Sequence, residues 1–317
     1  MTIATNAGQI VPIAHTRGRR RVNAETRARR MGWGLLAPAL TLLLIMTVVP
    51  TIYLVYFAFR HEDLLGSGSH FVGFLNFERV LTSPTVWWDS VSTIQFVVIS
   101  VALELGLGLL LALMLNKRLR ETNLITALFI LPLGVAPVVS ALVFRVLLDP
   151  SIGWVDYYLQ TWGLINEPID FFGDPTWAWV AVIGLDVWQW TPFCALILLA
   201  GLQGVPSEPK EAAMLDGAGP FRLFWHIVLP LLRPFLAIAL VLRAIEAFKT
   251  FASIFVLTGG GPGTSTEVIN LDLYRTALQD FDVGAAAALG ICFLLVLSVI
   301  MQQLLNILGR NTDILED

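Results

Sequence analysis

The chain has 317 residues, of which 56% are hydrophobic and only 14% are charged, and its mean hydropathy is +0.74. Soluble domains carry about 25% charged residues, so this composition excludes an ordinary soluble enzyme or binding module. The two cysteines lie within apolar runs and are too few for a disulfide framework, and the net charge of −4 is less informative than the distribution of basic residues described below.

Apolar runs long enough to cross a bilayer as a helix, about 20 residues, recur along the whole chain. They predict an all-α integral membrane protein with six transmembrane helices, at residues 33–59, 90–115, 123–148, 176–203, 234–257 and 285–308. A β-barrel is excluded, because barrel strands are about 10 residues long and alternate apolar with polar positions. The predicted organisation is listed here in chain order: an Arg-rich segment 1–32, a first helix 33–59, an outer loop 60–89, a transport core 90–309 that contains a cytoplasmic loop at 205–233, and a tail 310–317.

Basic residues fix the predicted orientation. Seven arginines lie between Arg17 and Arg30, and the loops after the second, fourth and sixth helices bring the basic residues on that side to fourteen. The other side has only Arg60, Arg79 and Arg275. Cytoplasmic loops are enriched in Lys and Arg, so both termini are predicted to be cytoplasmic. The first helix is too long for a cleavable signal, and the arginines beside it favour contact with anionic lipid over binding of nucleic acid.

The stretch from Glu211 to Pro234, "EAAMLDGAGPFRLFWHIVLPLLRP", is unusually polar for a loop between two apolar helices. Ser207 is a candidate N-cap of a short helix, with Pro209 in its first turn. Gly217 is expected to end that helix and Pro220 to begin the next. The physical reading leaves two alternatives, a solvated interhelical loop or a docking knob whose small Ala212 and Ala213 admit another backbone.

The spacing within this stretch is specific. Glu-Ala-Ala is followed after three residues by Gly, after nine more by Ile, and after one more by Leu-Pro; these residues are Glu211, Ala212, Ala213, Gly217, Ile227, Leu229 and Pro230. The pattern resembles the EAA loop of binding-protein-dependent ABC importer permeases. From about residue 90 onward, "VWQWTPFCALILLAGLQGVP", "AFKTFASIFVLTGGGPGTSTE" and "FDVGAAAALG" are similar to the carbohydrate (maltose-type) branch of that family.

The resemblance implies a function, a set of partners and a location. It implies a permease subunit of an ATP-driven importer for an oligosaccharide or polyol, in the bacterial inner or plasma membrane. The implied partners are a second permease subunit, two ATPase subunits, an extracytoplasmic solute-binding protein, a sugar and membrane lipid. The residues implied to couple the permease to the ATPase are Glu211, Ala212, Ala213, Asp216 and Gly217.

No phosphate-binding loop is found in this chain. Neither Gly-Lys-Ser nor Gly-Lys-Thr occurs, and the glycine-rich "TGGGPG" at Thr258–Gly263 lacks the lysine that reaches the phosphates. We therefore expect no cofactor and no catalysis in this chain, with ATP and Mg²⁺ on the separate ATPase subunits. The four histidines are scattered and show no metal-ligand spacing.

Six ionisable residues lie within the predicted helices: Glu104, Arg145, Asp186, Arg243, Glu246 and Lys249. Charges inside a membrane are costly, so they face a protein interior or a water-filled path. Arg243 and Asp186 are expected to form a structural ion pair, while Glu104 and Arg145 are expected to make interhelical or interfacial contacts. Glu246 is expected to pair with Arg243 or Lys249, or to bridge to a partner permease.

Helical spacing places polar and aromatic side chains on one face of each of two helices. On the fourth helix these are Gln189, Trp190 and Phe193, in line with Asp186; on the fifth they are Glu246, Lys249, Thr250 and Ser253. Sugar sites combine aromatic walls with a few fixed polar groups. The resemblance adds Ala247, at which the maltose-type permeases have a polar residue, and it makes Phe193, Lys249 and Thr250 substrate contacts as well.

Two rival functions stay open at this point. The first is an ion-coupled secondary transporter that uses Glu104 or Glu246 as an ion site, although the internal repeat expected of such a protein is not evident. The second is a membrane-embedded enzyme or scaffold, for which no catalytic constellation is found.

Overall fold

The structure is a computed structural model that describes residues 17–62, 68–116 and 127–312, with side chains described for 31–62, 68–116 and 127–307. It divides into two compact units, Met1–Leu54 and Val55–Asp317. The first unit consists of most of helix α1 (Arg17–Ala58), whose apolar part is Met31–Ala58 with a mean hydropathy of 2.2. The backbone of the Arg-rich segment is therefore helical from Arg17 onward.

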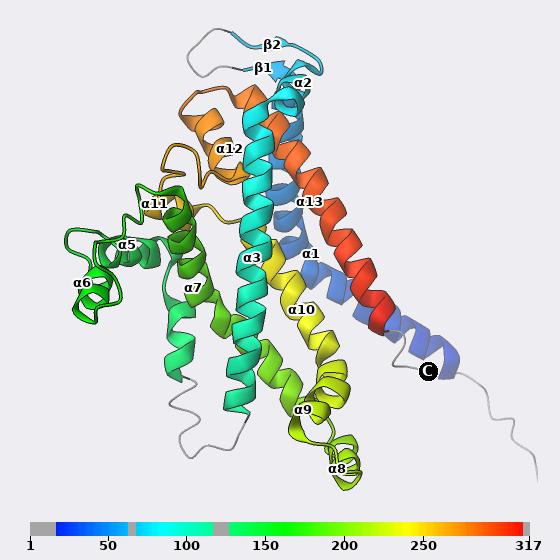
Figure 1. Cartoon of the computed structure of the whole chain (residues 1–317). Coiled ribbons are helices and arrows are strands. Elements are labelled where there is room, and N and C mark those ends of the chain that lie inside the picture. The colour runs from blue at the N-terminus through cyan, green and yellow to red at the C-terminus, as the bar shows by residue number, and fades with distance from the viewer. Residues whose placement is uncertain (1–16, 63–67, 117–126, 313–317) are drawn as a thin grey trace, which may run out of the picture. The chain divides into compact units, whose positions relative to one another are not determined.

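Four long helices form the body of the second unit: α3 (Pro84–Leu115), α7 (Pro175–Gly204), α10 (Leu229–Phe248) and α13 (Val283–Thr312) (Figure 1). The shorter elements are α2 (Leu75–Thr82), η1 (Leu131–Gly134), α5 (Pro137–Leu147), α6 (Trp154–Thr161), α8 (Glu208–Leu215), α9 (Pro220–Leu223), η2 (Phe224–Val228), α11 (Ala252–Leu257) and α12 (Ile269–Leu278). Two short strands, β1 (Arg60–His61) and β2 (His70–Phe71), pair antiparallel. Within this unit α8 and α9 lie at the opposite end from α2 and α12 (Figure 1).

Local sequence explains where the long helices begin. The Ser83 side chain accepts a hydrogen bond from the Val86 amide and is followed by a proline at the first helical position of α3. The Asp174 carboxylate accepts from the amides of Thr176 and Trp177 at the start of α7. Such caps satisfy amides that have no partner within a helix.

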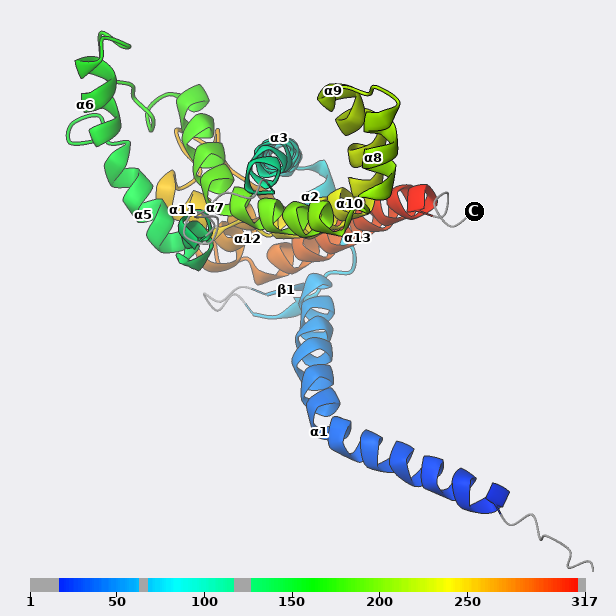
Figure 2. The ribbon, with the colours of Figure 1, turned by 90° about the horizontal axis from the view of Figure 1, so that it is seen from below.

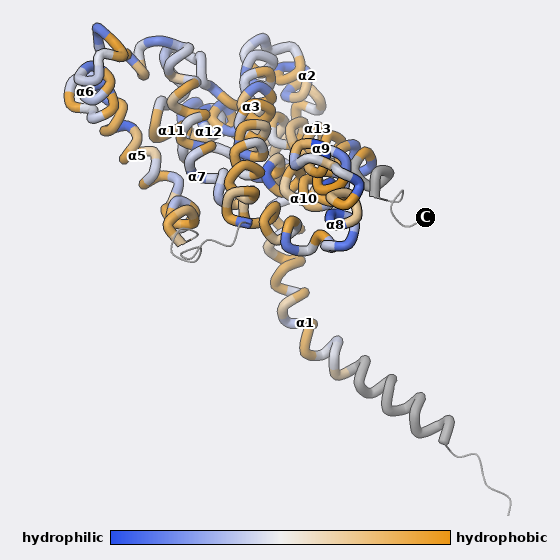
Figure 3. The backbone as a smooth tube through the Cα atoms, turned by 60° about the horizontal axis from the view of Figure 1, so that its bottom comes forward, coloured by the Kyte–Doolittle hydropathy of each residue, from blue (hydrophilic) through white to orange (hydrophobic). Residues whose placement is uncertain are grey.

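Close packing of α3, α7 and α10 depends on small residues. A Cβ atom on Gly108 of α3 would lie 2.7 Å from the Cβ of Cys194 on α7, and one on Gly201 would lie 2.5 Å from the Phe235 ring on α10. Glycine therefore lets these helix backbones approach one another. Seen from below, α3, α7 and α10 lie beside one another, and the hydropathy colouring shows apolar residues along α3, α5 and α10 (Figures 2 and 3).

Among the described residues, five helical segments are long and apolar enough to cross a membrane, or six if one bent pair counts as a span. They are Met31–Ala58, Pro84–Leu115, Pro175–Gly204, Pro220–Phe248 and Val283–Ile307, with the pair Ala127–Gly134 and Pro137–Leu147 as the sixth. The prediction of an all-α protein with repeated apolar helices is confirmed. The first, fourth and sixth predicted spans agree with the structure to within a few residues. The second also agrees, but its helix begins six residues earlier than predicted. Lys117, Arg118 and Arg120, the basic residues of the loop after the second predicted helix, lie outside the described residues.

The third predicted span, 123–148, is wrong as a single straight helix. Its two described parts are bent by 102° at Val135–Ala136. Ala136 is extended (φ −61°, ψ 138°) because it precedes Pro137, which disfavours the helical conformation at the residue before it. The sequence signal was present in "LPLGVAP", in which Pro132, Gly134 and Pro137 interrupt the apolar run.

The fifth predicted span, 234–257, begins too late and ends too late. The helical path runs from Pro220 to Phe248, with a π-helical turn at Phe224–Val228, and α11 is a separate short helix. Pro230 and Pro234 have no N–H to donate to the preceding turn, which agrees with the irregular winding there. The three residues from Lys249 to Phe251, which we call the span break, separate α10 from α11.

Candidate functional site

The EAA segment, Glu211–Pro230, folds as a short helix, a turn and a second helical run. Gly217 has φ +79°, and the Ala218 amide donates to the carbonyl oxygen of Ala213, which closes the end of α8. Pro209 lies in the first turn and Pro220 begins α9, as predicted. Ser207 occupies the N-cap position, as predicted, although its side chain makes no capping hydrogen bond.

The EAA segment is exposed on several sides. Helix α8 contains no buried residue, and its charged Glu211 and Asp216 are exposed. Ala212 is exposed and Ala213 is half-buried, as a docking surface made of small side chains requires. Three large apolar side chains lie close by in sequence and are also exposed: Leu215 at 88%, Phe221 at 76% and Trp225 at 50%. An exposed mixture of this kind is typical of a surface that binds another protein.

A buried charge cluster joins α3, α7 and α10 in the interior of the second unit. The Arg243 guanidinium donates from Nε and Nη2 to the Glu104 carboxylate, with the Nη2–Oε1 bond at 2.8 Å, and from Nη2 to Asp186 Oδ2 at 2.8 Å. All three residues are at most 5% exposed. The Arg243–Asp186 pair was predicted, and the interhelical contact expected of Glu104 is confirmed, although its partner was not named in advance. Its position in a very apolar helix was the available signal, because a charge there needs a partner.

Aromatic residues of α7 lie beside this cluster. The Arg243 guanidinium carbon is 4.8 Å from the centre of the Trp190 ring, a cation–π geometry. The Trp190 and Phe193 rings are 6.2 Å apart and perpendicular, and both are half-buried. Gln189 is only 3% exposed, and its amide donates to the Val135 carbonyl oxygen at 2.7 Å. Gln189 is therefore buried and bonded to the bend of the third span.

The polar residues predicted on the fifth span do not share one continuous helix face, because the span break interrupts it. Lys249 Nζ lies 2.7 Å from Glu246 Oε1, and the Thr250 and Ser253 hydroxyls are 3.2 Å apart. The side chains of Glu246 and Lys249 are 46% and 57% exposed, whereas Ala247 is buried. The structure thus brings these four polar residues into two neighbouring pairs at the break and leaves Ala247 in the core.

Sequence reasoning missed the residue that contacts the span break from α12. Asn270 Nδ2 donates to the carbonyl oxygens of Phe248 at 2.8 Å and of Thr250 at 3.0 Å. No local pattern points to Asn270, since its partners lie 22 and 20 residues earlier in the chain. Arg145, the remaining intramembrane charge, donates to the Val256 carbonyl oxygen at 2.8 Å and so makes an interhelical contact between α5 and α11, as predicted.

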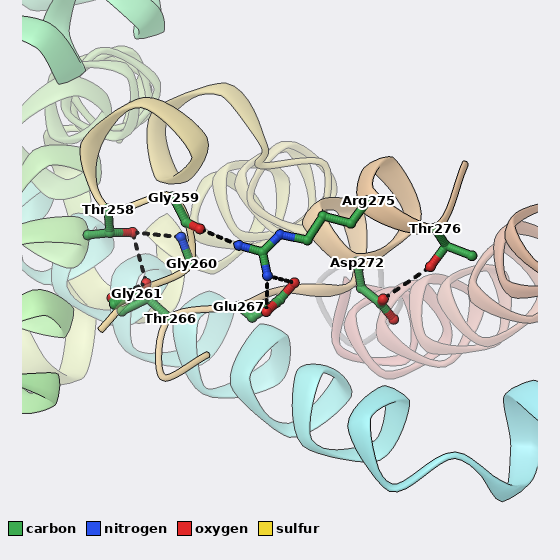
Figure 4. A network of polar contacts seen from close by, with 9 residues as sticks. All are labelled: Thr258, Gly259, Gly260, Gly261, Thr266, Glu267, Asp272, Arg275 and Thr276. Atoms are coloured by element: carbon green, nitrogen blue, oxygen red, sulfur yellow. Dashed lines mark hydrogen bonds and ion pairs between the residues drawn. The ribbon is translucent and has the colours of Figure 1, made fainter. Parts of the chain in front are cut away.

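The outer loop, Thr258–Glu267, is cross-linked by polar contacts (Figure 4). Arg275 of α12 donates to both carboxylate oxygens of Glu267 at 2.6 Å and to the Gly259 carbonyl oxygen at 2.5 Å. The hydroxyl groups of Thr258 and Thr266 are 2.8 Å apart. Burial raises the pKa of the Glu267 carboxyl, against the opposing effect of Arg275. The loop is therefore a fixed structure, as expected of a turn, and it carries no feature of a nucleotide site.

Within the part of the chain that the structure describes, no group of three His, Cys, Asp or Glu residues is placed to hold a metal ion. The geometry instead provides an exposed docking segment at one end of the second unit and a polar break in a span that leads to it.

Comparisons with known proteins agree on one family. The model of the "Binding-protein-dependent transport system inner membrane component" family matches residues 104–314. The trehalose/maltose transport system permease protein MalF of Thermococcus litoralis is 37% identical over 273 residues, which are 86% of this chain and 92% of that protein. The sn-glycerol-3-phosphate transport system permease protein UgpA of Agrobacterium fabrum is 32% identical over 263 residues, 83% of this chain and 89% of that protein.

A solved structure has the same fold over almost the whole chain. It is the crystal structure of a bacterial ABC transporter involved in the import of the acidic polysaccharide alginate, with a TM-score of 0.79 and 25% sequence identity. The match covers 92% of this chain and 99% of that chain.

Proposed function

This chain belongs to the family of binding-protein-dependent transport system inner membrane components, a multi-pass membrane permease subunit of an ABC transporter, and we propose that it carries an oligosaccharide or polyol through an ATP-driven importer. The observation that carries this proposal is the EAA segment, which combines the fixed family spacing with an exposed helix that has no buried residue. Relatives named for trehalose and maltose and for sn-glycerol 3-phosphate support a sugar or polyol as the substrate.

The proposed coupling residues are Glu211, Ala212, Ala213, Asp216 and Gly217. Their exposure leaves them free to enter a cleft of an ATPase subunit, and the apolar Leu215 and Phe221 beside them add contact area. The run from Pro220 to Phe248 is helical throughout, with only one π-turn, so a displacement of α8 is transmitted along α10 to the span break. ATP and Mg²⁺ would act on the ATPase subunits, not on this chain.

The proposed substrate path uses α7 and the span break. Trp190 and Phe193 offer half-buried aromatic surface, and Glu246, Lys249, Thr250 and Ser253 offer polar groups. Gln189 and Ala247 are buried and would shape the path without contacting the substrate. Lys249 is paired with Glu246 in the described part of the path, so no single positive charge is left there to select an anion, which favours an uncharged sugar.

The proposed partners follow from the family and from the exposure of these surfaces. They are a second permease subunit, two ATPase subunits and an extracytoplasmic binding protein, with membrane lipid around the apolar helices. An ion-coupled secondary transporter is not favoured: the family model describes a binding-protein-dependent transport system, and the Glu104 carboxylate is engaged by Arg243.

The test is the behaviour of Glu211→Ala in the complex purified gently from its own membranes. We expect the wild-type complex to contain an ATPase and a second permease, and its ATP hydrolysis to rise with loaded binding protein. In Glu211→Ala, uptake into proteoliposomes should fall by at least about tenfold, equivalent to about 1.4 kcal/mol, since a charged contact to the ATPase is lost. Unchanged uptake, with normal membrane insertion, would contradict the coupling role.

Glu208→Ala is the matched control, because Glu208 is an exposed carboxylate in the first turn of the same helix but lies outside the EAA pattern. We expect Glu208→Ala to retain uptake. An equal loss in both variants would show that net charge on α8 matters and that the EAA position does not.

A further inference from the structure

The span break exposes backbone carbonyl groups in an otherwise apolar span. In a continuous helix the carbonyl oxygens of Phe248 and Thr250 would accept from the amides of Ala252 and Ile254, four residues on. Helix α10 ends at Phe248, and Phe251 (φ −148°, ψ −59°) is not helical, so these bonds are not part of α10 or α11. A backbone group without a partner at membrane depth costs several kcal/mol, so a break there needs compensation.

Asn270 supplies that compensation. Its side-chain amide has two hydrogens, and Nδ2 donates to the Phe248 carbonyl oxygen at 2.8 Å and to the Thr250 carbonyl oxygen at 3.0 Å. Both acceptors lie at the edge of the same break. One side chain therefore replaces the two backbone amides that a straight helix would have used.

The backbone around Asn270 is itself held in place. The Ile269 amide donates to the Thr93 hydroxyl of α3 at 3.0 Å in a buried contact. On the other side, Arg275 binds Glu267 and the Gly259 carbonyl oxygen, which ties α12 to the outer loop (Figure 4). The amide of Asn270 is thus presented to the break by a part of the molecule that is fixed at two further points.

We propose that Asn270 is a positioning residue that keeps the fifth span broken at Lys249–Phe251 and so sets the placement of Lys249, Thr250 and Ser253. This proposal rests on the proposed function only for the statement that these three residues line the sugar path. Asn270 needs no contact with the sugar. Its effect passes through the carbonyl groups of Phe248 and Thr250.

The same chemistry recurs at the end of α1, which provides a matched control. Asn76 Nδ2 donates to the carbonyl oxygens of Ala58 at 3.0 Å and of Arg60 at 2.8 Å, the same spacing of two residues between acceptors. Asn76 is far from the proposed path in sequence and packs beside Gly284 of α13. Replacing Asn76 removes the same two hydrogen bonds without touching the span break.

Amide hydrogen exchange of the assembled complex tests the proposal without any sugar. Ala252, Ser253 and Ile254 form the first turn of α11, where amides have no acceptor within the helix. Asn270→Ala and the isosteric Asn270→Asp both lack the amide donor. In these variants we expect α10 and α11 to join into one helix. Exchange at these three amides should then slow by about tenfold or more. Unchanged or faster exchange in both variants would overturn the proposal, and Asn76→Ala should leave these amides unchanged.

Trehalose uptake into proteoliposomes is the second readout. If Asn270 positions path residues, both Asn270 variants should raise the KM for trehalose more than they lower the maximal rate, while Asn76→Ala should leave the KM unchanged. Slowed exchange with an unaltered KM would show that Asn270 keeps the span broken, and it would overturn the claim that Asn270 positions residues of the sugar path. Failure of the wild-type complex to take up trehalose would count against the proposed substrate, and the exchange result would still decide the role of Asn270.

Discussion

Two basic residues near the C-terminal end of α10 carry the same charge but differ in burial and in the origin of their partners. Arg243 is 1% exposed and is held by two carboxylates and an aromatic ring. Lys249, about two turns further along, has a side chain 57% exposed and a single carboxylate partner on its own helix. The Arg243 guanidinium links three helices, whereas the Lys249 ammonium group pairs with a carboxylate in its own helical turn. Arg243 is therefore part of a structural ion cluster, because it is buried and its partners come from other helices. Lys249 is exposed and remains accessible to a ligand.

The largest expected effect comes from breaking the buried cluster. Arg243→Met leaves Glu104 and Asp186 as buried carboxylates without their cation, and removal of one partner from a buried ion pair costs about 3–5 kcal/mol. We expect little folded subunit in the membrane and a large fall in the unfolding temperature of what remains. The triple variant Arg243→Met, Glu104→Gln and Asp186→Asn should recover much of the stability, since no charge is left unpaired. A stable Arg243→Met protein would contradict the structural role.

Substitution in the exposed Glu246–Lys249 pair should change transport activity and leave the stability of the protein almost unchanged. Lys249→Met removes an ion pair of a class worth about 0–1 kcal/mol, so the unfolding temperature should stay close to that of the wild type. If Lys249 lines the path, the KM for trehalose should rise by about tenfold, the loss expected for one hydrogen bond from a charged group. The measurement is uptake into proteoliposomes alongside thermal unfolding. A stable variant with unchanged KM would place Lys249 outside the path.

Asp272 is an intermediate case, because it is half-buried and its hydrogen-bond partner is the neutral Thr276 hydroxyl. Burial raises the pKa of its carboxyl, and the Thr276 hydroxyl, which donates to it at 3.3 Å, opposes that shift. The folded state then holds a proton that the unfolded state has released, so stability falls as pH rises upward from the ordinary value of 3.8.

Unfolding temperatures across this pH range test the point. Asp272→Asn should flatten the decline with pH, and Thr276→Val, which removes the opposing hydrogen bond, should make it steeper. A decline that is identical in the wild type and in both variants would show that Asp272 does not contribute to it.

Local patterns in the sequence predicted the helices that local interactions define. The spans 90–115 and 176–203 correspond to α3 and α7, which are continuous apolar runs capped by Ser83 and Asp174 next to prolines. The short helix α8 was predicted because its glycine, prolines and small residues act within one short segment, and its docking role stays a prediction.

The breaks within the third and fifth spans were not predicted, although Pro132, Gly134 and Pro137 mark the first of them, because the contacts that hold both breaks are distant in sequence. Each break is compensated by a distant amide: Gln189 serves Val135, 54 residues away, and Asn270 serves Phe248, 22 residues away. Likewise Glu104 binds Arg243 across 139 residues. Hydrophobic periodicity carries no information about such partners, so the polar residues of the fifth span were placed on one helix face that does not exist.

The exposed apolar side chains beside α8 have a consequence for how the cell regulates this subunit. Leu215, Phe221 and Trp225 are exposed when this chain is alone. Chaperones and proteases recognise such exposed apolar surface and remove chains that display it. If the EAA segment docks on an ATPase subunit as proposed, a copy without its ATPase would be marked for degradation by these exposed side chains. Subunit stoichiometry would then be set after synthesis, through the survival of assembled copies and the loss of orphans.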